Sequence, residues 1–137
     1  MKKIKIDYLS TLFVGIDIGS RTNVISALNF DQDFLIKMVP VANAQGGAEQ
    51  MEEMVAEVLS QHHEFKTVII GLESTGFYGV HIANYLSTSE KLAPFSTKVY
   101  CLNPNEVKQY KKSFNSLDKN DGIDSFVIAD FARVGRI

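Results

Sequence analysis

Two carboxylates stand at the ends of apolar, strand-like runs of the sequence. Asp17 follows Gly15 by two positions, and Glu73 follows Gly71 by two positions. Residues two apart in a strand share one face of the sheet, so each acid has a bare glycine on its own side. The missing side chain leaves room for an ion, a phosphate or a closely packed helix. A carboxylate in such a place is costly unless it is paired or bound to a metal ion.

A second acidic pattern lies near the carboxyl end of the sequence. Asp121 and Asp124 are three residues apart, so a helix would place them on one face. They flank an apolar stripe, where a helix meets a sheet, and a hard divalent cation is the usual compensation for neighbouring carboxylates. Asp118 and Asp121 have the same spacing, and Asp130 falls inside the stripe. First-turn acids also favour the helix dipole, so the residues alone leave these alternatives open.

The elements that must position these acids follow from hydrophobic periodicity. Three strand-like runs come first, at residues 12–18, 23–30 and 34–41, with short polar breaks that indicate antiparallel hairpins. A long amphipathic helix is expected next. Its apolar positions are Met51, Met54, Val55, Val58, Leu59, His62 and Phe65.

The second half alternates strands and helices. Residues 67–72 and 98–102 are typical of strands, with a helix at residues 77–86 between them. Asn103 and the following Pro104 and Glu106 supply an N-cap, a first-turn proline and an acid at the third position of a new helix.

A last helix completes the predicted order. Its apolar face consists of Ile123, Phe126, Val127, Phe131 and Val134. Three antiparallel strands followed by helix, strand, helix, strand and helices predict an α/β fold. This order fits the ribonuclease-H-like architecture, a mixed sheet of about five strands flanked by helices. Periodicity alone also fits several other α/β folds.

Three segments carry a resemblance to a known family. They are residues 14–19 (VGIDIG), 73–78 (ESTGFY) and 119–124 (KNDGID). Their order and spacing resemble the three acidic motifs of the DEDD transposases of the insertion-sequence one-ten group, relatives of site-specific DNA invertases. The resemblance covers essentially the whole chain. It implies a RuvC-like domain whose catalytic and metal-binding residues are Asp17, Glu73, Asp121 and Asp124.

The third motif also decides between the alternative acidic pairs. Lys119 matches the basic residue that precedes the third acid in the family, which favours Asp121 and Asp124. Two mild departures are Asn120, where threonine is common, and Ser125, where alanine is common.

Full members of the family continue into a C-terminal domain with a nucleophilic serine, to which residues 1–137 show no counterpart. The resemblance therefore predicts that residues 1–137 are a single RuvC-like N-terminal domain, from a fragment or a truncated protein. The isolated domain is not expected to be fully active.

The implied reaction is metal-dependent phosphoryl transfer on DNA during transposition. Two cations about 3.5–4 Å apart would activate the attacking oxygen and stabilise the leaving one. Because an all-carboxylate site suits hard cations, the expected ion is Mg²⁺, with Mn²⁺ as a substitute. The implied partners are DNA, a structured guide-type RNA and, in the full-length protein, further copies of the chain.

A local basic patch accompanies the third motif, although the net charge of the chain is −2. Between Lys98 and Lys119 there are five lysines and two acids. Their place before the acidic pair suits phosphate contacts beside the metal ions, and a solvated face is the alternative. The predicted nucleic-acid-binding residues are Lys108, Lys111, Lys112 and Lys119.

The composition is that of an ordinary globular protein, with 45% hydrophobic and 22% charged residues. Cys101 is the only cysteine, so an intrachain disulfide is excluded, and its strand-like surroundings predict a buried free thiol. We therefore expect a reducing, cytoplasmic compartment. No apolar run approaches the length of a membrane span, and no membrane partner is expected.

Two alternative functions remain open at this stage. Residues 15–20 (GIDIGS) also resemble the first phosphate motif of sugar kinases and actin-like ATPases. Those proteins need a second lobe to enclose nucleotide, and the helix of Asp121 and Asp124 has no clear role in them. The other alternative is a non-catalytic assembly module that binds DNA, RNA or a sister subunit.

Overall fold

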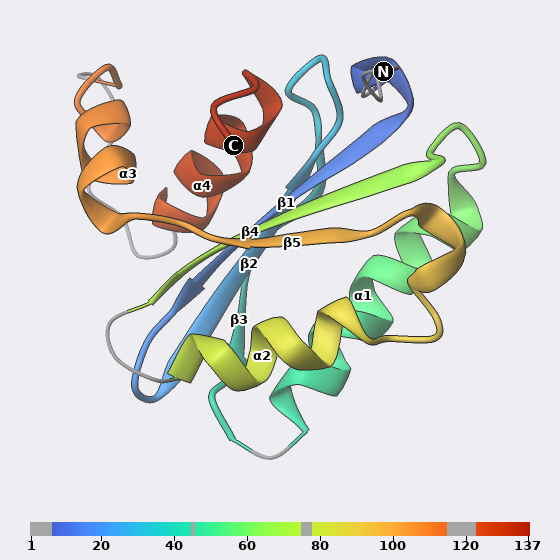
Figure 1. Ribbon diagram of the computed structural model, residues 1–137, viewed down its shortest axis with the longest axis horizontal. Helices are drawn as coiled ribbons and strands as arrows, with labels where there is room; N and C mark the ends of the chain where they lie inside the picture. Colours follow the sequence, from blue (N-terminus) through green and yellow to red (C-terminus); the bar gives the residue numbers. More distant parts are fainter. Residues whose placement is uncertain (1–6, 45, 75–77, 115–122) are drawn as a thin grey trace, which may run out of the picture.

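A five-stranded mixed sheet in the order β3-β2-β1-β4-β5 forms the centre of the computed structural model (Figure 1). The structure describes residues 7–44, 46–74, 78–114 and 123–137. The first three strands are antiparallel, and β4 and β5 run parallel to β1. The predicted α/β sheet with antiparallel first strands is confirmed. The strands are β1 (Thr11–Ile18), β2 (Thr22–Leu28), β3 (Phe34–Ala42), β4 (Thr67–Ser74) and β5 (Lys98–Cys101).

Helices cover both faces of the sheet. Helices α1 and α2 lie on one face, and α4 lies on the other with α3 beside it (Figure 1). Two short 3-10 helices, Tyr8–Ser10 and Ala93–Phe95, precede β1 and β5. The α-helices are α1 (Gly47–Gln61), α2 (Tyr78–Ser87), α3 (Pro104–Lys111) and α4 (Ile123–Arg133).

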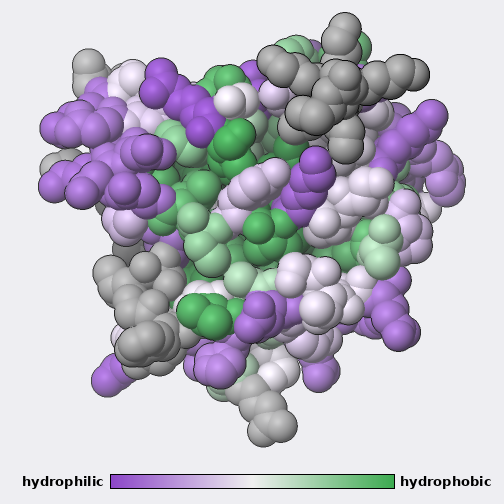
Figure 2. Space-filling view, in the orientation of Figure 1, coloured by the Kyte–Doolittle hydropathy of each residue, from purple (hydrophilic) through white to green (hydrophobic). Residues whose placement is uncertain are grey.

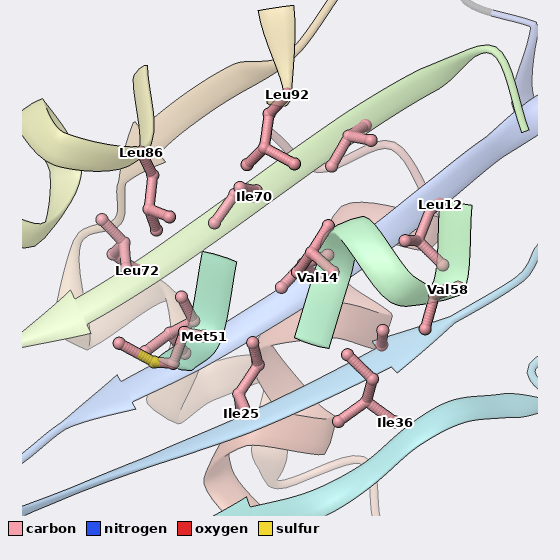
Figure 3. Packing of buried hydrophobic residues seen from close by; sticks show 14 of the residues in the cluster. Leu12, Val14, Ile25, Ile36, Met51, Val58, Ile70, Leu72, Leu86 and Leu92 are labelled. Atoms are coloured by element: carbon pink, nitrogen blue, oxygen red, sulfur yellow. The ribbon is translucent and has the colours of Figure 1, made fainter. Parts of the chain in front are cut away.

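Residues 12–16 of the central strand β1 are apolar on both faces, and helices cover both faces. Its residues Leu12, Val14 and Ile16 face α1 and α2 and are fully buried. Figure 3 shows Leu12 and Val14 among side chains from β4, α1 and α2, including Ile70 and Met51. Phe13 lies on the opposite face, where it packs with a residue of α4. A strand buried on both faces is the expected place for a rigidly held functional side chain.

Gly15 and Gly71, which have no side chains, lie beneath α4. The two glycines are register partners across β1 and β4. A Cβ atom at Gly15 would stand 2.2 Å from the carbonyl oxygen of Ser125 and 2.4 Å from the amide nitrogen of Ala129. At Gly71 the nearest atoms, at 3.1 Å, belong to side chains, including that of Ile128. The sequence left open whether an ion, a phosphate or a closely packed helix lies above Gly15. The structure shows the closely packed helix.

Several helix ends agree with the sequence pattern and others do not. The side chain of Asn103 accepts a hydrogen bond from the amide of Asn105 and caps α3, as predicted. Helix α1 ends at Gln61, so Phe65 packs into the core from the following loop instead of from the helix. Val134 follows the end of α4 and is 44% exposed, which corrects its predicted place on the apolar helix face.

The prediction that Cys101 is a buried thiol is wrong. Cys101 is exposed. It ends β5, which is a short strand at the edge of the sheet and has a neighbouring strand on one side only. Among the residues that the structure describes, no helix combines the length and apolar character needed to cross a membrane.

Replacing Gly15 with alanine tests the close packing of α4. We expect Gly15→Ala to lower the free energy of unfolding by about 3 kcal/mol, because the backbone of α4 must move away from the new methyl group. Gly71→Ala is the matched control, with an expected loss of about 1 kcal/mol, since side chains can yield there. Urea unfolding measures both. Equal losses for the two variants would contradict the difference in packing.

Candidate active site

Asp17 and Glu73 are register partners on the neighbouring strands β1 and β4. Both lie on the face of the sheet that α4 covers, in line with Gly15 and Gly71. Neighbouring strands lie about 4.8 Å apart, so the two carboxylates emerge side by side. The prediction that the two acids share one face, with Asp17 on a central strand, is confirmed.

Asp124 is the second residue of α4, and its negative charge acts on both sheet acids. The start of α4 and the ends of β1 and β4 lie on the same side of the molecule (Figure 1). Burial and the negative charges of Asp17 and Asp124 raise the pKa of Glu73 to about 7. Burial and the charge of Asp124 also raise the pKa of Asp17. The three carboxylates therefore belong to one electrostatic cluster.

One ammonium group partly compensates this cluster. The Nζ atom of Lys111, the last residue of α3, lies 2.5 Å from Oδ1 of Asp124. Its positive charge lowers the pKa values of Asp17 and Glu73, against the larger effect of burial. Sequence reasoning selected Lys111 as a phosphate contact and did not anticipate its ion pair with Asp124.

Asp130 holds α3 and α4 together and is not a member of the cluster. Its side chain is buried and accepts hydrogen bonds from Tyr110 Oη at 2.6 Å, Gln32 Nε2 at 2.9 Å and Arg133 Nε at 2.6 Å. Burial alone would raise the pKa of Asp130, but the bonds from Arg133, Tyr110 and Gln32 outweigh it and hold the pKa below its ordinary value. These partners give Asp130 a structural role.

A buried hydroxyl pair ties α4 to the sheet. The Oγ atoms of Ser26 on β2 and Ser125 on α4 are 2.7 Å apart. The backbone carbonyl of the same Ser125 faces Gly15. In the sequence, Ser125 is a mild departure from the family pattern, in which alanine is common at this position. Its small side chain was the one feature of the sequence that could have indicated a close contact here.

Asp121 and Lys119, which sequence reasoning assigned to the site, lie outside the described residues. Within the described part of the chain, no three His, Cys, Asp or Glu side chains form a group that could hold a metal ion as they stand. The donor set still fits a divalent cation chemically, because Asp17, Glu73 and Asp124 offer hard carboxylate oxygens whose repulsion a cation would relieve.

The remaining predicted lysines are Lys108 on α3 and Lys112, the residue that follows the end of α3. Lys108 and Lys112 are exposed, in contrast to the half-buried Lys111. Figure 2 shows hydrophilic side chains gathered over the region of α3. The structure thus brings Lys111 to the acidic cluster and leaves Lys108 and Lys112 facing solvent.

Residues 14–137 match the model of the DEDD transposases of the IS110 group, a family of transposases. The chain belongs to this family. The match spans the three acidic motifs and decides between the transposase and kinase-type interpretations in favour of the transposase. The curated proteins contain no match to the sequence.

Two solved structures are similar to the transposase domain, and the first of them shows its fold. One is T. thermophilus RuvC in complex with a Holliday junction substrate, with a TM-score of 0.58 and 15% identity, covering 91% of this chain and 96% of the RuvC chain. Another is the inorganic polyphosphate/ATP-glucomannokinase from Arthrobacter sp. strain KM, with a TM-score of 0.44 and 17% identity, covering 75% of this chain and 48% of that one. The second likeness is too low to carry an argument. The transposase domain has a RuvC-like, ribonuclease-H-like fold and belongs to a family of DNA-processing enzymes. Nucleases of this kind generally depend on divalent metal ions.

We expect the metal-free transposase domain to become less stable as the pH rises from about 5 to about 8. The pKa of Glu73 is about 7 in the folded state against an ordinary value of 4.5, so the folded chain retains a proton that the unfolded chain releases. The stabilisation from this proton is complete below the ordinary pKa of 4.5 and is lost as the pH rises through the folded-state pKa of about 7.

Thermal melts in chelator measure this pH dependence. Glu73→Gln should melt with a smaller decrease between about pH 5 and 8 than the wild-type chain, because the titrating group is gone. Glu57→Gln, a change at an exposed position of α1, is the control and should keep the wild-type dependence. Indistinguishable slopes for all three proteins would show that Glu73 does not carry the effect.

Proposed function

We propose that this domain catalyses metal-dependent phosphoryl transfer on DNA during transposition, with Asp17, Glu73, Asp121 and Asp124 as catalytic metal ligands. The observation that carries the proposal is the pairing of Asp17 with Glu73 in the sheet, beneath a helix that adds the charge of Asp124. Carboxylates that repel one another in a half-buried place destabilise the fold unless a cation compensates them. A metal-binding role accounts for this arrangement.

Each described acid has a distinct part in the proposed site. Asp17 and Glu73 present their oxygens from the sheet, and Asp124 presents its oxygens from the first turn of α4. These acids would hold a divalent cation, which would supply the positive charge to polarise a phosphoryl group and activate an attacking oxygen. We assign Mg²⁺ as the natural ion, because it is commonly bound through one or two carboxylates together with substrate phosphates, and Mn²⁺ as its substitute.

The proposed substrate is DNA, held in part by the basic outer side of α3. Lys108 and Lys112 are one helical turn apart and exposed, close to Lys111 at the acidic cluster. We include Lys111 and Lys119 in the nucleic-acid-binding set. The similar RuvC structure contains a Holliday junction, which supports DNA as the partner of this fold. We also infer, from the family resemblance, a guide-type RNA and further copies of the full-length protein as partners.

We further infer that residues 1–137 act as one RuvC-like domain beside a C-terminal domain that carries the nucleophilic serine. In this arrangement the acidic site would act on phosphate groups, and the covalent step would belong to the other domain. No serine of residues 1–137 is assigned the nucleophilic role.

Asp17→Asn tests the metal site. In chelator this variant should melt no lower than the wild-type chain, because it removes one of the repelling charges. At a Mn²⁺ concentration of about 100 times the dissociation constant, the wild type should gain about 2.7 kcal/mol and the variant much less. Asp31→Asn, at an exposed position, is the control and should respond to Mn²⁺ as the wild type does. Equal shifts in all three proteins would exclude a metal-binding role for Asp17.

Removing the exposed lysines at the end of α3 and directly after it tests the nucleic-acid surface. We expect Lys108→Ala/Lys112→Ala to weaken DNA binding and to reduce the slope of log affinity against log salt by up to about 2, since each lysine neutralises about one phosphate. The control is Lys66→Ala/Lys98→Ala, which removes the same amount of charge at the starts of β4 and β5, away from α3. Fluorescence anisotropy at several salt concentrations measures both. The same loss in both double variants would indicate a general charge effect without a specific surface on α3.

A further inference from the structure

We propose that Lys111 is the internal counter-cation of the acidic cluster, which pairs with Asp124 in the metal-free protein and yields Asp124 to a divalent cation. Lys111 would thereby set the affinity of the site for metal. This inference rests on the proposed metal site formed by the acids, and it adds a residue that competes with the metal.

The geometry places the ammonium group where it competes directly. Lys111 Nζ lies 2.5 Å from Asp124 Oδ1, an oxygen that the proposed metal site needs. The two side chains are 42% and 44% exposed, so an incoming cation can reach the pair from solvent. Oδ1 of Asp124 cannot pair with Lys111 and bind a metal ion at the same time.

The position of Lys111 is determined by the packing of α3. The preceding residue, Tyr110, donates a hydrogen bond to the buried Asp130 of α4, and Val107 is buried in the core cluster beneath α3. The last turn of α3 is thus held against α4, which brings Lys111 to the helix that carries Asp124. Lys108 on the same helix and Lys112 directly after it are exposed to solvent, so among these three neighbouring lysines only Lys111 pairs with Asp124.

The relative strength of the two interactions indicates which cation prevails. A partly exposed ion pair contributes about 1 kcal/mol or less. A divalent cation carries twice the charge and can be shared by several carboxylates of the cluster, whereas the ammonium makes its short contact with one of the described carboxylates, that of Asp124. The ammonium therefore compensates the acids when metal is scarce and is displaced when metal is sufficient. Once released, it stands beside the cluster, available to a phosphate of the substrate.

Titration of the chain with Mn²⁺ in the absence of DNA tests this competition. We expect Lys111→Ala to bind Mn²⁺ at least about threefold more tightly than the wild type by calorimetry, because the competing ammonium is gone. Lys111→Arg keeps the charge and should stay near the wild-type affinity. Lys112→Ala, the neighbouring exposed lysine, controls for the general loss of one positive charge and should also stay near the wild type.

A second measurement needs no metal. In chelator, Lys111→Ala should melt below Lys112→Ala, because only the first change leaves the acids without their counter-charge. Mn²⁺ affinities of Lys111→Ala equal to or weaker than those of Lys112→Ala would overturn the inference. If Asp17→Asn abolishes Mn²⁺ binding while Lys111→Ala leaves it unchanged, the metal site stands and the role of Lys111 falls. If the wild type itself takes up no Mn²⁺, the proposed function and this inference both fail.

Discussion

The contact between α4 and β1 at Gly15 is the constraint on which the candidate site depends. The backbone of α4 comes so close to the strand that a single methyl group would collide with it. A helix packed this closely must be small or apolar around most of its surface, and residues 125–132 of α4 are all buried. The first turn of the helix is thereby placed over the sheet acids. The position of Asp124 follows from a glycine that carries no chemistry itself.

The sequence predicted the sheet half of the site well because that half follows from a local rule. Side chains alternate along a strand, so the positions of Asp17 and Glu73 relative to their glycines could be read without knowledge of the fold. The packing of α4 above the glycines could not be predicted from the same local rule. It depends on a helix more than one hundred positions farther along the chain than Gly15.

The errors and omissions share a dependence on tertiary partners. Cys101 has strand-like neighbours in the sequence, but its exposure results from the edge position of β5, which a local pattern does not contain. The role of Asp130 depends on donors that include Gln32, 98 positions away. The ion pair of Lys111 with Asp124 likewise requires two helices to be placed side by side. Residue type and spacing indicated which groups were available, and the packing determined how they were used.

The parallel register of β1 and β4 divides the acidic cluster into a fixed and an adjustable part. The backbone pairing of β1 with β4 sets the spacing of Asp17 and Glu73. Asp124 is carried by a separate helix whose position depends on side-chain packing and on its connection to α3 through Asp130. A macromolecule that binds α3 would therefore shift one carboxylate of the candidate site while the other two stay in place. Such a division is suited to allosteric control, in which assembly on the correct nucleic acid completes an otherwise incomplete catalytic centre.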